Sequence, residues 1–340
     1  FRFVPDPRGG DDSGRGFHSR TLRAAALKGL ENEIAARSAA LASAEDTAIT
    51  LSEHGKLWWD GAIVAKLTRG PSPLAPNIQF LADEHVKTDA LEQRLRAWLA
   101  ARITGRLGAL EALQGAAGAR SGTDGAFQGP SAGAARGVAH QLVENFGALE
   151  RAALTLPDKL GPLIRTLRPF GVWFGHRYVY LPRLLRPDAA ALLTLLWGVW
   201  EGKNPPPAAP LPGLTSFVID KGTDLHALHA AGFAVIARRA IRFDMLERLE
   251  DEMEKALASG ADAQSVLTRA ISLLGAGKDE GRAVLAALGW RLIQVVDSAP
   301  VWRRKPRARA KPRQNRTPGP VKIDPDSPFA GLAALLVKRT

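Results

Sequence analysis

The sequence of 340 residues contains no cysteine. This absence excludes disulfide frameworks, thiol catalysis, and zinc or iron–sulfur sites with Cys ligands, and it fits a reducing compartment. Long apolar runs are also missing. The longest, around residues 192–200, is about half of the roughly 20 residues that a membrane-spanning helix needs. We therefore expect a cytoplasmic protein without membrane contact, long enough to form two or more domains.

Motifs for nucleotide hydrolysis are absent as well. A P-loop has the pattern G-x-x-x-x-G-K-[ST], because backbone amides hold the phosphates while Lys neutralises them. Gly-Lys pairs occur at 55–56, 202–203 and 277–278, but none is followed by Ser or Thr and none has Gly five positions earlier. Asp83-Glu84-His85 begins like a DExH motif, but Val86 follows directly. The start of a helix is the better interpretation.

Signals for catalysis or metal binding are weak. The carboxylates of residues 247–254 favour a solvated helix face over a metal site. His226 and His229 lack a firm third ligand for zinc, and His140 with Glu144 is typical of a surface pair. No signature of a Ser/His/Asp hydrolase or of a zinc protease occurs. The sequence therefore predicts no metal and no cofactor in this chain, and no enzymatic activity of its own.

Positive charge is concentrated at one end of the sequence. The formal net charge is +12, and residues 303–340 hold eleven Lys and Arg against two Asp, which gives +9 there and +3 for residues 1–302. Within residues 303–323, repulsion between neighbouring charges and four prolines oppose packing, so we predict a disordered basic tail there. A tail of this composition favours polyanion binding, because Lys and Arg displace counterions from phosphates. A solubilising tail or contact with an acidic protein is the alternative.

Periodicity and turn signals predict an α+β chain that is mainly α. Apolar residues at helical spacing predict helices over 19–44, 87–113, 135–154, 187–201, 244–257, 262–274 and 279–288, with short ones after Pro157 and over 330–337. Alternation and the Asp60-Gly61 turn signal predict a three-stranded meander over 49–69. Strands are predicted over 170–181 and 233–243, and a mobile connection over 115–134. Adjacent Trp58 and Trp59 should point to opposite faces of the meander.

The predicted strand 170–181 combines aromatic side chains with arginines. Aromatic rings can stack on bases while Arg contacts phosphates, so Arg177 and Arg183 are candidate RNA contacts. Packing of the aromatic face on neighbouring helices is the alternative. The predicted nucleic-acid-binding residues are these two and the tail residues Arg303, Arg304, Lys305, Arg307, Arg309, Lys311, Arg313 and Arg316.

Six stretches in order resemble a known family. They are GKLWWDGAIVAKL (55–67), GVAHQLVENFGALER (137–151), the run 170–197, IRFDMLERLED (241–251), LLGAGKDEGRAVLAALGWR (273–291) and DPDSPFAGLAAL (324–335). Together with the basic, Pro-rich tail they resemble the C-terminal portion of an alphaproteobacterial superfamily 2 helicase. That family is related to the mitochondrial RNA-degradosome helicase and to the wider DExH RNA helicases.

The resemblance implies an accessory region of an ATP-dependent helicase. The two motor domains of the family, which bind ATP and Mg²⁺, lie N-terminal to the matched region, so none of their residues transfers to this sequence. The implied partners are RNA or single-stranded DNA and the motor domains in cis. The first residue is Phe rather than Met, which suggests a processed chain or part of a longer one. The alternative is a non-enzymatic adaptor whose Arg-rich tail binds a ribosome or an RNA-decay assembly.

These considerations predict six regions. Residues 1–16 are a loop from a missing motor, 17–203 a helical accessory domain, and 204–213 a Pro-rich linker. Residues 214–302 form a small α-rich module. The basic tail over 303–323 and a short helical segment over 324–340 complete the chain.

Overall fold

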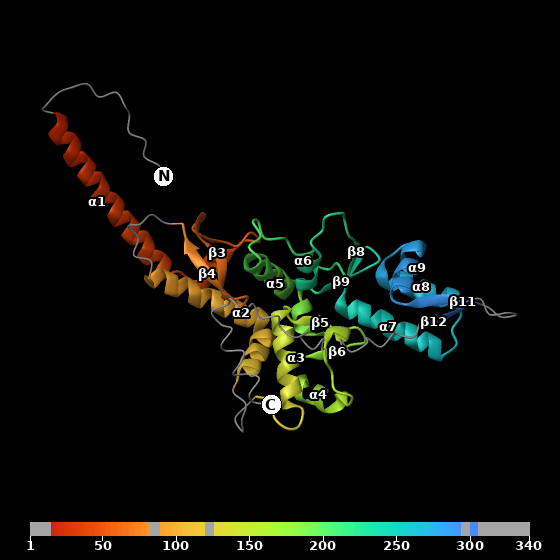
Figure 1. The fold of residues 1–340 in the computed structure, drawn as a ribbon. Coiled ribbons are helices and arrows are strands. Elements are labelled where there is room, and N and C mark those ends of the chain that lie inside the picture. Colours follow the sequence, from red (N-terminus) through yellow and green to blue (C-terminus); the bar gives the residue numbers. More distant parts are fainter. Residues whose placement is uncertain (1–14, 82–88, 120–125, 294–299, 305–340) are drawn as a thin grey trace, which may run out of the picture. The chain divides into compact units, whose positions relative to one another are not determined.

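The computed structural model describes residues 15–81, 89–119, 126–293 and 300–304 (Figure 1). Helices and small antiparallel sheets alternate along the chain, so the predicted α+β class with mainly α content is confirmed. Contacts divide the chain into Phe1–Arg303 and Arg304–Thr340, and only Arg304 of the second part is described. Among the described residues, no helix has the length and apolar content required to cross a membrane.

The first sheet has four strands where three were predicted. Strands β1 (Ile49–Leu51), β2 (Lys56–Trp59), β3 (Ala62–Ser72) and β4 (Ala75–Phe80) pair in this order. The predicted turn at Asp60-Gly61 is confirmed, with positive φ at both residues. The predicted end of the meander at residue 69 is wrong, because β3 continues to Ser72 and pairs with β4. Gly70 permits this, since a Cβ there would lie 1.9 Å from the carbonyl oxygen of Ala75.

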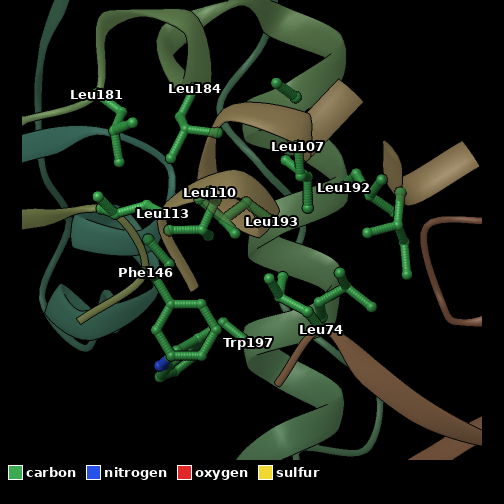
Figure 2. Close-up of a cluster of buried hydrophobic side chains, with 14 of the residues drawn as sticks. Leu74, Leu107, Leu110, Leu113, Phe146, Leu181, Leu184, Leu192, Leu193 and Trp197 are labelled. Atoms are coloured by element: carbon green, nitrogen blue, oxygen red, sulfur yellow. The ribbon is translucent and has the colours of Figure 1, made fainter. Parts of the chain in front are cut away.

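Helices build most of the larger hydrophobic core. They are α1 (Arg15–Ala42), α2 (Asp89–Gly118), α3 (Ala132–Glu144), α4 (Leu160–Leu167) and α5 (Pro187–Trp200), of which α2 and α5 pack on this sheet. Figure 2 shows leucines of α2 and α5 meeting in this core, with Trp197 of α5 beside Phe146. A leucine buried in such a core contributes about 1.5–3 kcal/mol, and nearly every residue of α5 between Ala189 and Val199 is buried.

Two helices end at other residues than predicted. Helix α2 continues to Gly118, so the described part of the predicted connection 115–134 is shorter than expected. Helix α3 ends at Glu144 rather than near 154, because Phe146 and Gly147 adopt positive φ and turn the chain into strand β5 (Ala148–Glu150). A Cβ on Gly147 would also lie 2.2 Å from Leu184, so only glycine fits both the conformation and the space.

The aromatic segment is a hairpin rather than one strand. Strand β6 (Trp173–Phe174) turns at 175–177 into β7 (Tyr178–Tyr180), and the sheet order is β5-β7-β6. The register pairs Trp173 with Tyr180. The prediction of one continuous strand over 170–181 is therefore wrong, and all three residues of β7 are buried.

Short 3₁₀ helices connect several elements of this region. They are η1 (Asp46–Ala48), η2 (Arg151–Ala153), η3 (Arg168–Phe170) and η4 (Pro182–Leu185).

The Pro-rich segment 204–213 is packed against α5. Pro206 is buried, and a Cβ on Gly198 would lie 2.8 Å from the Pro206 side chain. Beyond it come β8 (Ser216–Val218), α6 (Leu225–Ala230), β9 (Phe233–Ile236) and β10 (Arg239–Arg242), with sheet order β8-β10-β9. The predicted strand 233–243 is thus a hairpin, with positive φ at Ala237 and Arg238.

A second core forms around three helices close to their predicted bounds. These are α7 (Phe243–Ala258), α8 (Ala263–Leu274) and α9 (Lys278–Ala287), followed by the paired strands β11 (Trp290–Ile293) and β12 (Val301–Arg304). Asp244 lies in the first turn of α7, and its carboxylate pairs with Arg242, 2.7 Å away. Tyr178 and Tyr180 of β7 belong to this core. Residues on both sides of the Pro-rich segment therefore share one core.

Candidate nucleic-acid interface

Most of the predicted basic tail lies outside the described residues. This applies to Lys305, Arg307, Arg309, Lys311, Arg313 and Arg316, and to the predicted helical segment 324–340. Arg303 and Arg304 are described, and they belong to strand β12 rather than to a tail. Arg303 is exposed. Trp302 before it is buried and donates its indole N–H to the carbonyl oxygen of Ala263, 3.0 Å away.

Arg177 is engaged inside the fold. Its Nε lies 2.5 Å from Oε1 of Glu250, and its Nη2 donates to the carbonyl oxygen of Leu288 at 2.6 Å. The side chain is only 18% exposed and that of Glu250 is fully buried. Oε2 of Glu250 accepts from the Trp290 indole at 3.2 Å. Arg177 therefore joins the β6–β7 turn to α7 and to the end of α9, and its guanidinium is taken up by the protein rather than open to RNA as predicted.

The acidic face of α7 is partly buried, which corrects the prediction of a solvated helix face. The carboxylate of Glu247 accepts hydrogen bonds from three successive backbone N–H groups, those of His176, Arg177 and Tyr178. These hydrogen bonds offset the free-energy cost of removing the carboxylate from water, which a buried charge must recover from its partners. Gly175 is needed here, because a Cβ would lie 2.3 Å from the carboxylate carbon of Glu247.

The remaining acids of this face bind His176. Its Nε2 lies 2.7 Å from Asp251 and its Nδ1 3.5 Å from Glu254. Across the described residues, no group of three or more His, Asp or Glu side chains is arranged to hold a metal ion. The carboxylates that face the β6–β7 turn are thus paired with groups of the turn itself.

The two histidines weighed as zinc ligands do not converge. His226 is 88% exposed, whereas His229 packs against Tyr178 and Phe243 with ring centroids 6.3 and 5.4 Å away. Burial, with a smaller contribution from nearby His226, lowers the pKa of His229 to about 4. Burial also raises the pKa of Tyr178 well above its ordinary value. The predicted surface pair of His140 and Glu144 is confirmed at 3.3 Å.

Arg183 remains available on the surface. It lies on η4, is exposed, and makes no ion pair with any described residue. The exposed Trp173 is near it: Trp173 is the cross-strand partner of Tyr180, and three residues lead from Tyr180 to Arg183. Paired Cα atoms on neighbouring strands are about 5 Å apart, and each residue of extended chain adds about 3.4 Å. The Cα atoms of Trp173 and Arg183 therefore lie within about 15 Å of each other.

Two further cations at this surface were missed by the sequence reading. Arg165 of α4 and Arg168 of η3 are exposed, and no ion pair joins either of them to the described part of the chain. Trp173 follows Arg168 by five positions in the chain, so their Cα atoms lie within about 17 Å of each other. The i, i+3 spacing of two arginines just before an aromatic segment was the available signal. We call Arg165, Arg168, Trp173 and Arg183 the arginine–tryptophan surface.

Comparison of the chain with models of protein families, with curated proteins and with solved structures gave no match. Function is therefore inferred from the residues and their placement.

Proposed function

We propose that this chain is the nucleic-acid-binding accessory region of an ATP-dependent helicase that acts on RNA. The carrying observation is the arginine–tryptophan surface: three exposed arginines have no ion-pair partner among the described residues, and short chain segments keep two of them, Arg168 and Arg183, near a Trp that is 56% exposed. Guanidinium groups bind phosphates, and an exposed indole offers a face on which a base can stack. Both groups act on any sequence, as an accessory region requires.

The charges around this surface support the proposal. The carboxylates of α7 that face the neighbouring turn are taken up by His176, Arg177 and backbone N–H groups. They therefore do not neutralise the exposed arginines. Counterion release from the phosphates then supplies sequence-independent affinity, and the seven Lys and Arg of residues 305–322 add to it.

The motor part of the proposal rests on the family resemblance. ATP and Mg²⁺ belong to motor domains in cis, since the sequence contains no P-loop. The chain by itself then hydrolyses no ATP, with or without RNA. Turnover that RNA stimulates in a pure sample contradicts this assignment.

The test is the salt dependence of binding to a fluorescent single-stranded RNA, measured by anisotropy. Replacing the seven basic residues of 305–322 by Gln, with Arg303 and Arg304 kept because they belong to β12, should lower the slope of log K against log salt by about 5, at ~0.7 per contact. Replacing Arg165, Arg168 and Arg183 by Gln should lower it by about 2.

The matched control changes three exposed residues elsewhere, Lys28, Lys159 and Lys278, to Gln. Its slope should equal that of the wild-type chain. A wild-type chain that binds no RNA at low salt overturns the proposed function.

A further inference from the structure

The four-stranded sheet β1–β4 has one buried and one open face. Side chains alternate between them. Leu57, Ala65, Leu67 and Ile78 point into the core and are at most 7% exposed. On the other, open face Thr50, Lys56, Trp58, Lys66, Asn77 and Gln79 are exposed, and Ile63 and Thr68, the cross-strand partners of Trp58 and Asn77, are half-buried.

Two lysines lie directly opposite each other on this open face. Lys56 of β2 and Lys66 of β3 are cross-strand Cα partners, and Gln79 of β4 is the next partner of Lys66. Cβ atoms of such a pair are about 5 Å apart, and like charges in this position repel. Neither lysine makes an ion pair with the described part of the chain, and no residue of this face is acidic. The pair is therefore a concentration of positive charge without a counterion from the protein.

Acids of the sheet segment 49–80 occur only in its turns. They are Glu53 and Asp60. Asp60 pairs with Arg37 at 2.9 Å, and Glu53 lies 3.7 Å from His54. Neither carboxylate is on the open face, so neither offsets the lysine pair.

An aromatic ring stands beside the lysines. Trp58 follows Lys56 by two residues on the same strand, which places the two side chains on one face about 7 Å apart. The Trp58 side chain is 36% exposed, and its cross-strand partner on β1 is Thr50, a small polar residue that leaves the ring accessible. Leu57 between the two is fully buried, and the Leu67 N–H donates to the carbonyl oxygen of Gly55 at 2.7 Å. The backbone that presents the ring and the charges is thus held by the core.

We propose that the open face of the β1–β4 sheet binds a single strand of nucleic acid, with phosphates on Lys56 and Lys66 and one base stacked on Trp58. This inference rests on the proposed function. It adds a second contact with the strand, on the β1–β4 sheet rather than on the arginine–tryptophan surface. The lysine pair supplies charge complementarity, and a stacked base requires an unpaired strand, because the bases of a duplex are stacked on each other. Either RNA or DNA has this chemistry.

The experiment measures anisotropy of labelled oligouridine, oligothymidine and a duplex, each of about 20 nucleotides, which spans more than one site of a typical single-strand-binding fold. The full chain is titrated at about 0.05 and about 0.2 M salt. Trp58→Ala should weaken binding of both single strands about tenfold with an unchanged salt slope, because stacking releases no counterions. The duplex should lose less affinity.

The lysine variant has the opposite signature. Lys56→Gln together with Lys66→Gln should lower the salt slope by about 1.4, so that its defect shrinks about sevenfold between the two salt concentrations. Trp58→Phe keeps an aromatic face and should retain most of the affinity. The matched control, Lys159→Gln with Lys278→Gln, removes two exposed lysines elsewhere and should bind like the wild-type chain.

The outcomes separate this inference from the proposed function. Wild-type affinity and slope in both Trp58→Ala and the lysine variant, with the wild-type chain still binding, overturn the inference alone. A loss in Trp173→Ala but not in Trp58→Ala assigns stacking to the arginine–tryptophan surface instead. If the wild-type chain binds none of the three probes, the proposed function is overturned, and this inference with it. Circular dichroism and thermal unfolding of each variant confirm that it is folded, and Trp58→Phe with the Gln variants supplies substitutions that leave the core untouched.

Discussion

Two charged regions of this chain use their charges in different ways. At the β6–β7 turn, Glu247 and Glu250 are buried, and they accept hydrogen bonds from Arg177, Trp290 and the backbone of the turn. On the open face of the β1–β4 sheet, Lys56 and Lys66 are exposed, face each other, and have no partner within the described residues.

Burial explains the difference. A buried ion costs several kcal/mol unless opposite charge and hydrogen bonds surround it, so the turn must satisfy its charges internally. An exposed ammonium group is solvated by water and can stay unpaired at little cost. The charges of the turn therefore hold the fold together, whereas those of the sheet are free to meet a ligand. Three predictions test this contrast.

The largest expected effect is on the buried carboxylate. Glu250→Ala removes the partner of Arg177 and of the Trp290 indole, and it leaves a guanidinium that is mostly buried without its charge partner. We expect a loss of about 3–5 kcal/mol in the free energy of unfolding, measured by denaturant titration. Glu252→Gln on the same helix is the control. Its carboxylate is partly exposed and lies 3.6 Å from Lys255, so its change should stay within about 0.5 kcal/mol. Equal effects in the two variants contradict the contrast.

The next effect concerns pH. His229 lies against Tyr178 and Phe243, and its pKa falls to about 4 in the folded chain against about 6.5 when unfolded. Above pH ~6.5 it is neutral in both states. As the pH falls from ~6.5 to ~4 only the unfolded chain takes up the proton, so up to about 3 kcal/mol of stability is lost in that window.

A difference measurement isolates this histidine from the other titrating groups. His229→Leu should be less sensitive to pH between about 6.5 and 4 than the wild-type chain, and His226→Gln, which changes an exposed ring, should behave like the wild type. Parallel pH profiles of the wild type and His229→Leu are the outcome that contradicts the buried, neutral histidine.

The smallest effect is expected on the sheet. Lys66→Gln removes the repulsion from Lys56 and should change the free energy of unfolding by less than about 0.5 kcal/mol, in the stabilising direction. Raising the salt concentration should stabilise the wild-type chain slightly more than the variant, because salt screens the repulsion. A clear destabilisation of the variant means that Lys66 has a structural partner, and it removes the basis for the contrast.

Local signals predicted the elements whose cause is local. The Asp60-Gly61 hairpin formed as expected, and α8 and α9 begin within a residue of their predicted positions, because Asp262 caps one helix and Gly277 with Glu280 begins the other. The expectation that Trp58 and Trp59 face opposite sides agrees with the structure, in which Trp58 is exposed and Trp59 packs against the core.

Predictions failed where the deciding contact is remote in the sequence. The meander was predicted to end at residue 69, but β3 continues to Ser72 because its residues 65–68 pair with residues 77–80 of β4. Arg177 was counted among exposed arginines, although its partners Glu250 and Leu288 are 73 and 111 residues away. No periodicity within the 170–181 segment contains that information.

The sequence by itself determined the α+β class, the absence of a P-loop and of cysteine chemistry, and the uneven distribution of positive charge. These follow from composition, spacing and alternation, which act over a few residues. Only the tertiary structure decided which charges are buried and paired and which remain open. Burial depends on which segments pack together, and the acids of α7 became structural because the β6–β7 turn packs on them. Lys56 and Lys66 became a pair because β2 and β3 align in one register.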